Sequence, residues 1–216
     1  MNIKAMILDL DGTLFNTSED LCDSFNKAAA IYGYPPRGVK EFLMFVGSGA
    51  RNIVKKGLPE GVPDDIYEKV FVDYNRIYSE NLTTKTRPYD GIPEVLEEFV
   101  KAGVKLSVMS NKPDPHTKLI VRELLPKIPF VVVYGNKEGR PHKPDPEVPL
   151  EVASIMGTAP ADIAFVGDSD VDMKTGVNAK MIAVGCTWGF RDREVIAAAG
   201  AAYLMDSPRD LLDLLK

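Results

Sequence analysis

The stretch Ala5-Met6-Ile7-Leu8-Asp9-Leu10-Asp11-Gly12-Thr13 contains the features that decide the fold. Its first four residues are apolar, which indicates a strand buried on both faces, as in a parallel sheet. Asp9 and Asp11 follow at the carboxyl end of this strand, which is the edge where ligands bind in open α/β sheets. Because side chains alternate along an extended chain, both carboxylates are expected to point to the same side.

The two carboxylates predict a cation site. Anions this close repel each other, and one of them would keep its proton unless a cation lay between them. Carboxylate oxygens suit a hard ion such as Mg²⁺. Gly12 allows a sharp turn after the strand, and the Thr13 hydroxyl can bind an anion. A lone Asp-x-Asp is more often a turn at a strand end, so the remaining sequence decides between the two interpretations.

Three further polar segments follow strand-like segments in order along the chain. They are Ser110-Asn111-Lys112 after residues 106–109, Lys143 within residues 140–146, and Gly167-Asp168-Ser169-Asp170-Val171-Asp172 after residues 163–166. Together with Asp9 and Asp11 they supply a carboxylate nucleophile, a hydroxyl donor, a cation and a second acidic cluster. This set of groups is suited to phosphoryl transfer.

The second half of the chain alternates between helix and strand patterns. Helices are expected over residues 92–102, 115–125, 146–156, 171–178, 194–199 and 208–215, and strands over residues 105–110, 130–134, 163–167, 181–185 and 202–204. Such alternation predicts an α/β fold, with a Rossmann-like parallel sheet, right-handed crossovers and helices on both faces.

Residues 15–85 interrupt this alternation. Their apolar residues keep helical spacing, and turns rich in Gly and Pro separate the expected helices. We therefore expect an inserted helical domain of residues 15–85 and an α/β core of residues 1–14 and 86–216. The 216 residues are enough for both.

The composition argues against several other classes of protein. With 45% hydrophobic and 26% charged residues the chain is typical of a soluble globular protein, and no apolar run is long enough to span a membrane. The net charge of -5 argues against a nucleic-acid-binding surface. Cys22 and Cys186 have no metal-binding spacing. We expect a cytoplasmic protein, either monomer or homodimer, without a nucleic-acid or membrane partner.

The four polar segments resemble the motifs of the haloacid dehalogenase superfamily. The matching residues are Asp9-Leu10-Asp11-Gly12-Thr13, Ser110, Lys143 and Gly167-Asp168 with Asp172. Four elements in the same order are far more specific than any one of them alone. The resemblance covers essentially the whole chain and implies that residues 15–85 form the helical cap of that superfamily.

The resemblance also implies a role for each matching residue. Asp9 would attack phosphorus and form an aspartyl-phosphate, while Asp11 would act as general acid and then as general base. Mg²⁺ would be held by Asp9, the backbone carbonyl of Asp11 and Asp168. The groups that would bind the phosphoryl oxygens or stabilise charge are Thr13, Ser110, Asn111 and Lys143. Asp172 would support this site by orienting the lysine, although Asp170 is an alternative for that position.

The segment Val46-Gly47-Ser48-Gly49-Ala50-Arg51 resembles the glycine-rich cap loop of phosphoglycolate phosphatases. In that interpretation Ser48 and Gly49 contribute to the binding of a substrate carboxylate, and Arg51 adds a charged clamp. An equally weighted interpretation is the start of an ordinary helix with an exposed arginine.

These residues predict a Mg²⁺-dependent phosphatase that acts on a small phosphorylated metabolite, with 2-phosphoglycolate as the first candidate. Alternatives are a sugar-phosphate mutase that resembles β-phosphoglucomutase, or a phosphatase for a sugar phosphate, a nucleotide or pyrophosphate. The core motifs are common to all of them, and the sequence leaves the substrate and the acceptor of the phosphoryl group open. A binding protein that only kept the fold is disfavoured, since every catalytic position holds a competent residue.

Overall fold

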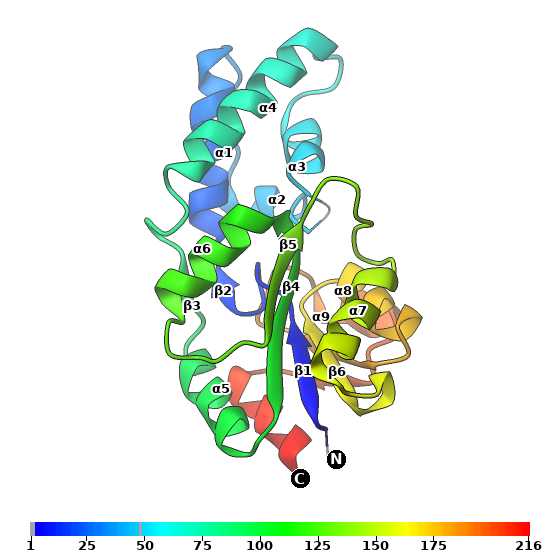
Figure 1. Cartoon of the computed structure of the whole chain (residues 1–216). Helices are drawn as coiled ribbons and strands as arrows, with labels where there is room; N and C mark the ends of the chain where they lie inside the picture. The colour runs from blue at the N-terminus through cyan, green and yellow to red at the C-terminus, as the bar shows by residue number, and fades with distance from the viewer. Residues whose placement is uncertain (1–2, 48) are drawn as a thin grey trace. The chain divides into compact units, whose positions relative to one another are not determined.

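The computed structural model describes residues 3–47 and 49–216 (Figure 1). The chain forms two compact units. One consists of Met1–Asn16 and Pro88–Lys216, which we call the core unit, and the other of Thr17–Arg87, which we call the inserted unit. Across the described residues, no helix has the length and apolar character that crossing a membrane requires.

The core unit contains a six-stranded sheet in the order β5-β4-β1-β6-β7-β8. All of its neighbouring strands run parallel. The strands are β1 (Ala5–Leu8), β4 (Lys105–Pro113), β5 (Val132–Asn136), β6 (Ile163–Gly167), β7 (Ile182–Cys186) and β8 (Tyr203–Met205). Strands β4 and β5 follow one another on one side of β1, and the chain then crosses to the other side of β1, where β6, β7 and β8 follow. The order therefore reverses beside β1, and ligands bind outside the carboxyl ends of strands at such a reversal.

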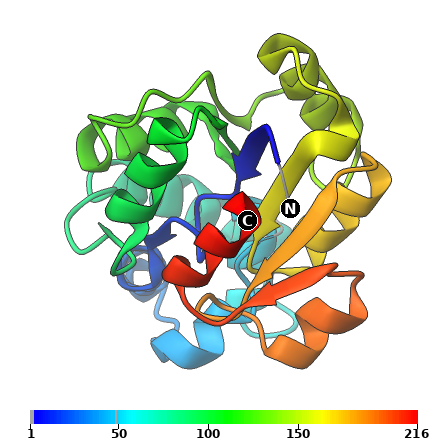
Figure 2. The ribbon, with the colours of Figure 1, turned by 90° about the horizontal axis from the view of Figure 1, so that it is seen from below.

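Helices cover the sheet on either side, as Figure 2 shows. They are α5 (Ile92–Lys101), α6 (Asp114–Leu124), α7 (Glu147–Met156), α8 (Asp170–Asn178) and α9 (Arg193–Ala198), with 3₁₀ segments at Pro160–Asp162 and Pro208–Leu215. Right-handed crossovers explain why helices lie on both faces of the sheet. The connections to β4 and β5 run across the sheet in the opposite direction to those that lead to β6, β7 and β8, so their helices lie on opposite faces. The α/β fold with a Rossmann-like parallel sheet is confirmed.

Three predicted segments of the core unit differ from the structure by more than one residue or in the type of helix. Strand β4 continues to Pro113 instead of ending at residue 110, and β5 begins at Val132 instead of residue 130. Val131 is exposed, so the apolar run extends beyond the buried strand on its amino-terminal side. The last segment is a 3₁₀ helix rather than an α-helix, although Ser207 and Asp210 form a capping box at its start.

The inserted unit is helical. Its helices are α1 (Ser18–Ile31), α2 (Val39–Leu43), α3 (Ala50–Gly57) and α4 (Asp64–Ser79). Aromatic pairs fill its interior: the ring centroids of Phe25 and Phe42 lie 5.2 Å apart, and those of Tyr74 and Tyr78 lie 5.9 Å apart. Phe25 and Tyr74 belong to the apolar spacing that predicted helices here.

The buried Asp20 ties the two ends of the inserted unit together. Its carboxylate accepts hydrogen bonds from the backbone N–H groups of Lys85 and Thr86 and from the Thr86 hydroxyl. The short strands β2 (Phe15–Asn16) and β3 (Arg87–Pro88), which pair with each other, lie where the chain leaves and rejoins the core unit. The predicted boundaries, between residues 14 and 15 and between 85 and 86, lie two residues from those of the two units.

Candidate active site

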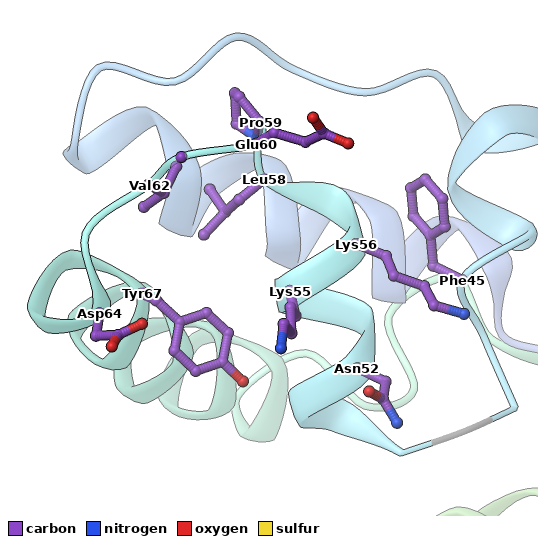
Figure 3. Close-up of a pocket in the computed structure, with 11 residues that line it drawn as sticks. Phe45, Asn52, Lys55, Lys56, Leu58, Pro59, Glu60, Val62, Asp64 and Tyr67 are labelled. Carbon is purple, nitrogen blue, oxygen red and sulfur yellow. The ribbon is translucent and has the colours of Figure 1, made fainter.

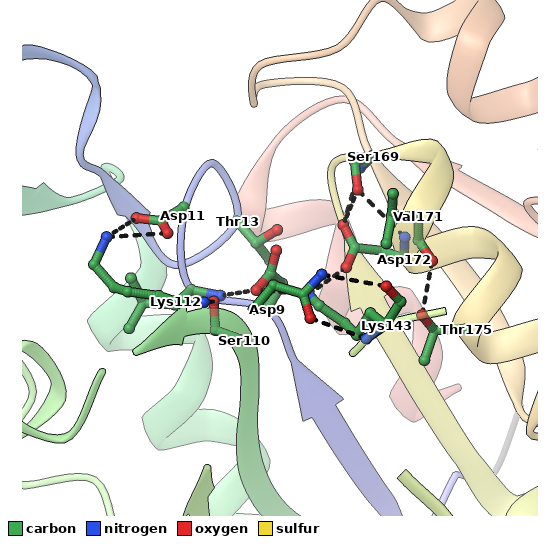
Figure 4. Close-up of polar contacts among 12 residues, drawn as sticks. Asp9, Asp11, Thr13, Ser110, Lys112, Lys143, Ser169, Val171, Asp172 and Thr175 are labelled. Atoms are coloured by element: carbon green, nitrogen blue, oxygen red, sulfur yellow. Dashed lines mark hydrogen bonds and ion pairs between the residues drawn. The ribbon is translucent and has the colours of Figure 1, made fainter. Parts of the chain in front are cut away.

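The sheet topology brings the predicted motif residues of the core unit together (Figure 4). Asp9 follows the central strand β1, Ser110 lies near the end of β4, and Asp168 follows β6. Lys143 lies in the connection between β5 and α7. Because parallel strands end at the same edge, four segments far apart in sequence meet around Asp9.

A buried lysine joins two buried carboxylates at the centre of this site. Lys143 Nζ lies 2.8 Å from Asp9 Oδ1 and 2.6 Å from Asp172 Oδ1. The three side chains are 2%, 9% and 0% exposed. Burial by itself lowers the pKa of Lys143, but the charges of Asp172 and Asp9 outweigh it and raise that pKa, so the amine stays protonated. The lysine provides a fixed positive charge next to the predicted nucleophile.

The site carries more negative charge than Lys143 neutralises. Burial, opposed by Lys143 and reinforced by Asp172, raises the pKa of Asp9 to about 7. Burial and the charges of Asp172 and Asp9 raise the pKa of Asp168 well above its usual value. Each of these three aspartates offers one oxygen, and the three oxygens lie within 4.8 Å of one another. A donor set of carboxylate oxygens with uncompensated charge fits a hard divalent cation such as Mg²⁺.

Two glycines make room for Asp168. A Cβ added at Gly12 would lie 2.2 Å from Asp168 Oδ2, and one added at Gly189 would lie 2.3 Å from Asp168 Cβ. Gly12 has a φ of +79°, so the sharp turn predicted after β1 is present. The Phe190 N–H donates to Asp168 Oδ2 at 2.7 Å, and the Thr13 hydroxyl donates to Asp168 Oδ1 at 3.3 Å. Thr13 therefore orients an acidic residue of the site, a contact that the sequence did not reveal.

Of the two aspartates that the sequence left as alternatives, Asp172 is the one that lies in the site. It is fully buried, and its carboxylate accepts from the Ser169 hydroxyl at 2.5 Å as well as from Lys143. Ser169 and Asp172 form a capping box at the start of α8, which fixes this carboxylate. Asp170 instead pairs with the exposed Lys174.

Asp11 is oriented differently from the prediction. Strand β1 ends at Leu8, so the alternation of an extended chain does not continue to Asp11. Its carboxylate faces Lys112, with Nζ 2.8 Å from Oδ1 and 3.1 Å from Oδ2, while the carboxylate of Asp9 faces Lys143 (Figure 4). Lys112 is a site residue that the sequence analysis quoted without giving it a role. The available signal was a lysine directly after the Ser-Asn pair at the end of a strand.

Ser110 and Asn111 hold the surrounding backbone. The Ser110 hydroxyl accepts from the Lys112 N–H at 3.3 Å. The Asn111 side chain accepts from the Lys143 N–H at 2.9 Å and donates to the Lys143 carbonyl at 3.3 Å. The side-chain amide of Asn111 therefore positions the segment that carries Lys143. The predicted binding of phosphoryl oxygens by Ser110 and by the backbone amide of Asn111 stays a prediction.

The predicted cap-loop residues belong to the inserted unit. Ser48 lies outside the described residues, and Gly49, with a φ of +87°, precedes α3. The exposed Arg51 side chain pairs with Glu68 at 2.6 Å and lies 4.3 Å from the centre of the Phe71 ring. Its guanidinium thus already has partners within the inserted unit, and its predicted role in binding a carboxylate stays a prediction.

The inserted unit also contains a cavity of about 780 Å³ next to α3. Figure 3 shows its lining residues, which come from α3, the start of α4 and the segment between them, together with Phe45 from the segment between α2 and α3. The polar lining side chains include Asn52, Lys55, Lys56 and Tyr67. Arg51 precedes this group in sequence and does not line the cavity.

Comparison with known proteins places the chain in a family. The family model described as haloacid dehalogenase-like hydrolase matches residues 6–186. An N-acetylmuramic acid 6-phosphate phosphatase from Pseudomonas aeruginosa is 32% identical over 217 residues, which cover 100% of this chain and 96% of that protein. A phosphoglycolate phosphatase from Salmonella typhi is 29% identical over 237 residues, which cover 99% of this chain and 93% of that protein.

A solved structure shows the same fold over the full length. It is the crystal structure of a candidate phosphoglycolate phosphatase from Lactobacillus delbrueckii subsp. bulgaricus, with a TM-score of 0.94 and 29% identity, and the match covers 100% of this chain and 99% of that one. The family match includes all four motif segments around Asp9 and confirms the resemblance seen in the sequence. The chain therefore belongs to the haloacid dehalogenase-like hydrolases.

Proposed function

We propose that this enzyme is a Mg²⁺-dependent phosphatase that transfers the phosphoryl group of a small ester to Asp9 and then to water. The observation that carries the proposal is the buried cluster of Asp9, Lys143, Asp168 and Asp172 at the carboxyl edge of the sheet. An aspartate held beside a fixed cation, at the edge where ligands bind, is placed to act as a nucleophile toward phosphorus.

The first half of the proposed reaction uses Asp9 and Asp11. An oxygen of Asp9 attacks phosphorus, and the bond between phosphorus and the leaving oxygen breaks as the Asp9–phosphorus bond forms. Asp11, protonated for this step, gives its proton to the leaving oxygen, so that an alcohol departs. Lys143 stabilises the negative charge that builds up on the phosphoryl oxygens next to Asp9.

The second half returns Asp9 to its starting state. Asp11, now a carboxylate, takes a proton from a water molecule whose oxygen attacks phosphorus. The bond between Asp9 and phosphorus breaks, and inorganic phosphate leaves. Bound Mg²⁺, held by Asp9, Asp168 and the backbone carbonyl of Asp11, would supply positive charge that offsets the repulsion between the carboxylates and the phosphoryl group.

The substrate proposal is 2-phosphoglycolate. Its support is the number of relatives named phosphoglycolate phosphatase, at 28–30% identity, together with the resemblance of the loop at Gly49 and Arg51. N-acetylmuramic acid 6-phosphate is the second candidate, because the relative named for it is 32% identical over the whole chain. Both candidates are phosphate esters that also carry a carboxylate. We assign the inserted unit the role of a cap that recognises this second group.

A substrate panel tests the proposal directly. The wild-type enzyme with Mg²⁺ should release phosphate from 2-phosphoglycolate with the highest kcat/KM, followed by N-acetylmuramic acid 6-phosphate, when compared with glucose 6-phosphate, a nucleoside monophosphate and pyrophosphate. Conversion of β-glucose 1-phosphate to glucose 6-phosphate without release of phosphate would show the mutase instead. Phosphate release from none of the esters would contradict the proposal altogether.

Replacing the nucleophile should stop the reaction and leave the fold intact. In Asp9→Asn an amide cannot attack phosphorus, whereas Lys143 keeps Asp172 as its ionic partner and one source of repulsion disappears. We expect no measurable turnover and a thermal midpoint at or above that of the wild type. Asp170→Asn is the matched control, because Asp170 pairs only with the exposed Lys174 among the contacts described for its carboxylate, and its activity should equal that of the wild type. Turnover of Asp9→Asn near the wild-type rate would disprove the nucleophile assignment.

Exchange of the metal ion should show different effects of Mg²⁺ and Ca²⁺ on activity. A chelator should abolish activity, and Mg²⁺ should restore it while Ca²⁺ should not. Ca²⁺ accepts about six to eight ligands and readily takes a carboxylate through both oxygens, which would occupy the attacking oxygen of Asp9. Initial rates after each ion is added back measure the effect. Equal rescue by Ca²⁺, or full activity in the presence of the chelator, would count against this site design.

The proposed role of Arg51 predicts a loss that depends on the substrate. Arg51→Ala should lower kcat/KM for 2-phosphoglycolate by about 10- to 100-fold, which corresponds to one charge-assisted contact. Hydrolysis of p-nitrophenyl phosphate, which lacks a carboxylate, should change little. Glu68→Gln is the control for the ion pair, since it removes the partner of Arg51 and leaves the guanidinium in place. Equal losses on both substrates, or no loss on either, would leave Arg51 as an ordinary surface residue.

A further inference from the structure

Lys112 and Asp11 form an ion pair at the end of β4 that is separate from the ion pairs of Lys143. Lys112 Nζ contacts both carboxylate oxygens of Asp11, at 2.8 and 3.1 Å. The side chains are 3% and 13% exposed, so this pair is largely withdrawn from water. A buried lysine needs an anionic partner, and a contact with both oxygens limits the rotation of the carboxylate.

The backbone of Lys112 is fixed on both sides. Its N–H donates to the Ser110 hydroxyl, and its carbonyl accepts from the hydroxyl of the buried Thr117 at 3.2 Å. The register between β4 and β5 is irregular between Met109 and Pro113, the segment that contains Lys112. The lysine side chain therefore leaves a defined point at the end of β4 and crosses to the loop that follows β1.

Asp11 lies outside the regular geometry of β1. It follows the end of β1 and precedes Gly12, whose positive φ turns the chain. The pKa of Asp9 is raised mainly by burial, and the charge of Asp11 adds to this effect. The nearby His116 offers no competing charge at neutral pH, because burial and the charge of Lys112 lower its pKa to about 4. Lys112 is thus the positively charged group whose position pairs it with the Asp11 carboxylate.

We propose that Lys112 is a positioning residue that holds the Asp11 carboxylate apart from the Asp9 cluster, at the place where the leaving oxygen receives its proton. This inference rests on the proposed phosphatase reaction and adds a residue to it. The proton passes from Asp11 to the leaving oxygen and later from water to Asp11, and Lys112 takes part in neither transfer. Its contribution is the orientation of Asp11 and the balance of charge around it.

Esters with different leaving groups distinguish this role from a structural one. An alkyl phosphate releases an alkoxide, which needs a proton, whereas p-nitrophenyl phosphate releases a phenolate that is stable without one. Lys112→Met should lower kcat/KM for the best alkyl phosphate of the wild-type enzyme by about 10- to 100-fold, a share of what general acid catalysis contributes. The value for p-nitrophenyl phosphate should change little. Lys112→Arg, which keeps the charge, should recover part of the loss.

The ratio between the two esters is insensitive to partial unfolding, because inactive protein lowers both rates equally. Lys174→Met is the matched control, since it removes an exposed lysine–aspartate pair outside the site and should leave the ratio unchanged. A double variant completes the test. If Lys112 acts through Asp11, then adding Lys112→Met to Asp11→Asn should cause almost no further loss. Because both partners of the ion pair are replaced, this variant leaves neither of the two charges without its partner.

The outcomes separate this inference from the proposed function. Hydrolysis of neither ester by the wild type would overturn the phosphatase proposal and this inference with it. If the wild type is active, parallel losses on both esters in Lys112→Met would show a structural role and overturn this inference alone. Unchanged or increased activity on the alkyl ester, or additive losses in the double variant, would do the same.

Discussion

The site depends on a single lysine placed between two carboxylates that have almost no access to water. Lys143 contacts Asp9 and Asp172, and without it these two anions would share a buried space that also contains Asp168. Burying unpaired charges of the same sign is among the most costly arrangements in a protein. The arrangement exists because the ends of β1 and β6 are neighbours in the sheet, and because Asn111 fixes the loop that carries the lysine.

Close packing restricts the positions of the acidic side chains in addition to the electrostatic interactions. Gly12 and Gly189 leave no room for a side chain next to Asp168, and a Cβ added at Gly167 would lie 2.2 Å from the Cβ of Asp172. The acidic residues are therefore enclosed by backbone as well as by charges. Such close packing lets the site hold several carboxylates in fixed positions, which a reaction at phosphorus requires of its nucleophile and of the groups that balance its charge.

The motif segments could be recognised in the sequence because three of them lie at the ends of parallel strands, and topology alone then brings Asp9, Ser110 and Asp168 together. Lys143 lies in the connection after β5, and its position depends on the hydrogen bonds between its backbone and Asn111. The prediction failed where an irregular local conformation replaced the regular geometry of a strand. The alternation used for Asp11 stopped at Leu8, and the contact of Lys112 with Asp11 joins residues 101 positions apart, a distance over which no sequence pattern operates. The inserted unit was predictable as helices, but the partners that its side chains choose depend on tertiary packing.

The most direct test of the account is to identify the phosphorylated residue during turnover. Enzyme mixed with Mg²⁺ and substrate, quenched in acid within a single turnover, can be digested and its peptides analysed by mass spectrometry. The account predicts a phosphoryl group on Asp9, absent when the metal is withheld and absent in the Asp9→Asn variant. A phosphoryl group on another residue would contradict it, as would rapid release of phosphate with no modified peptide at any time in the first turnover.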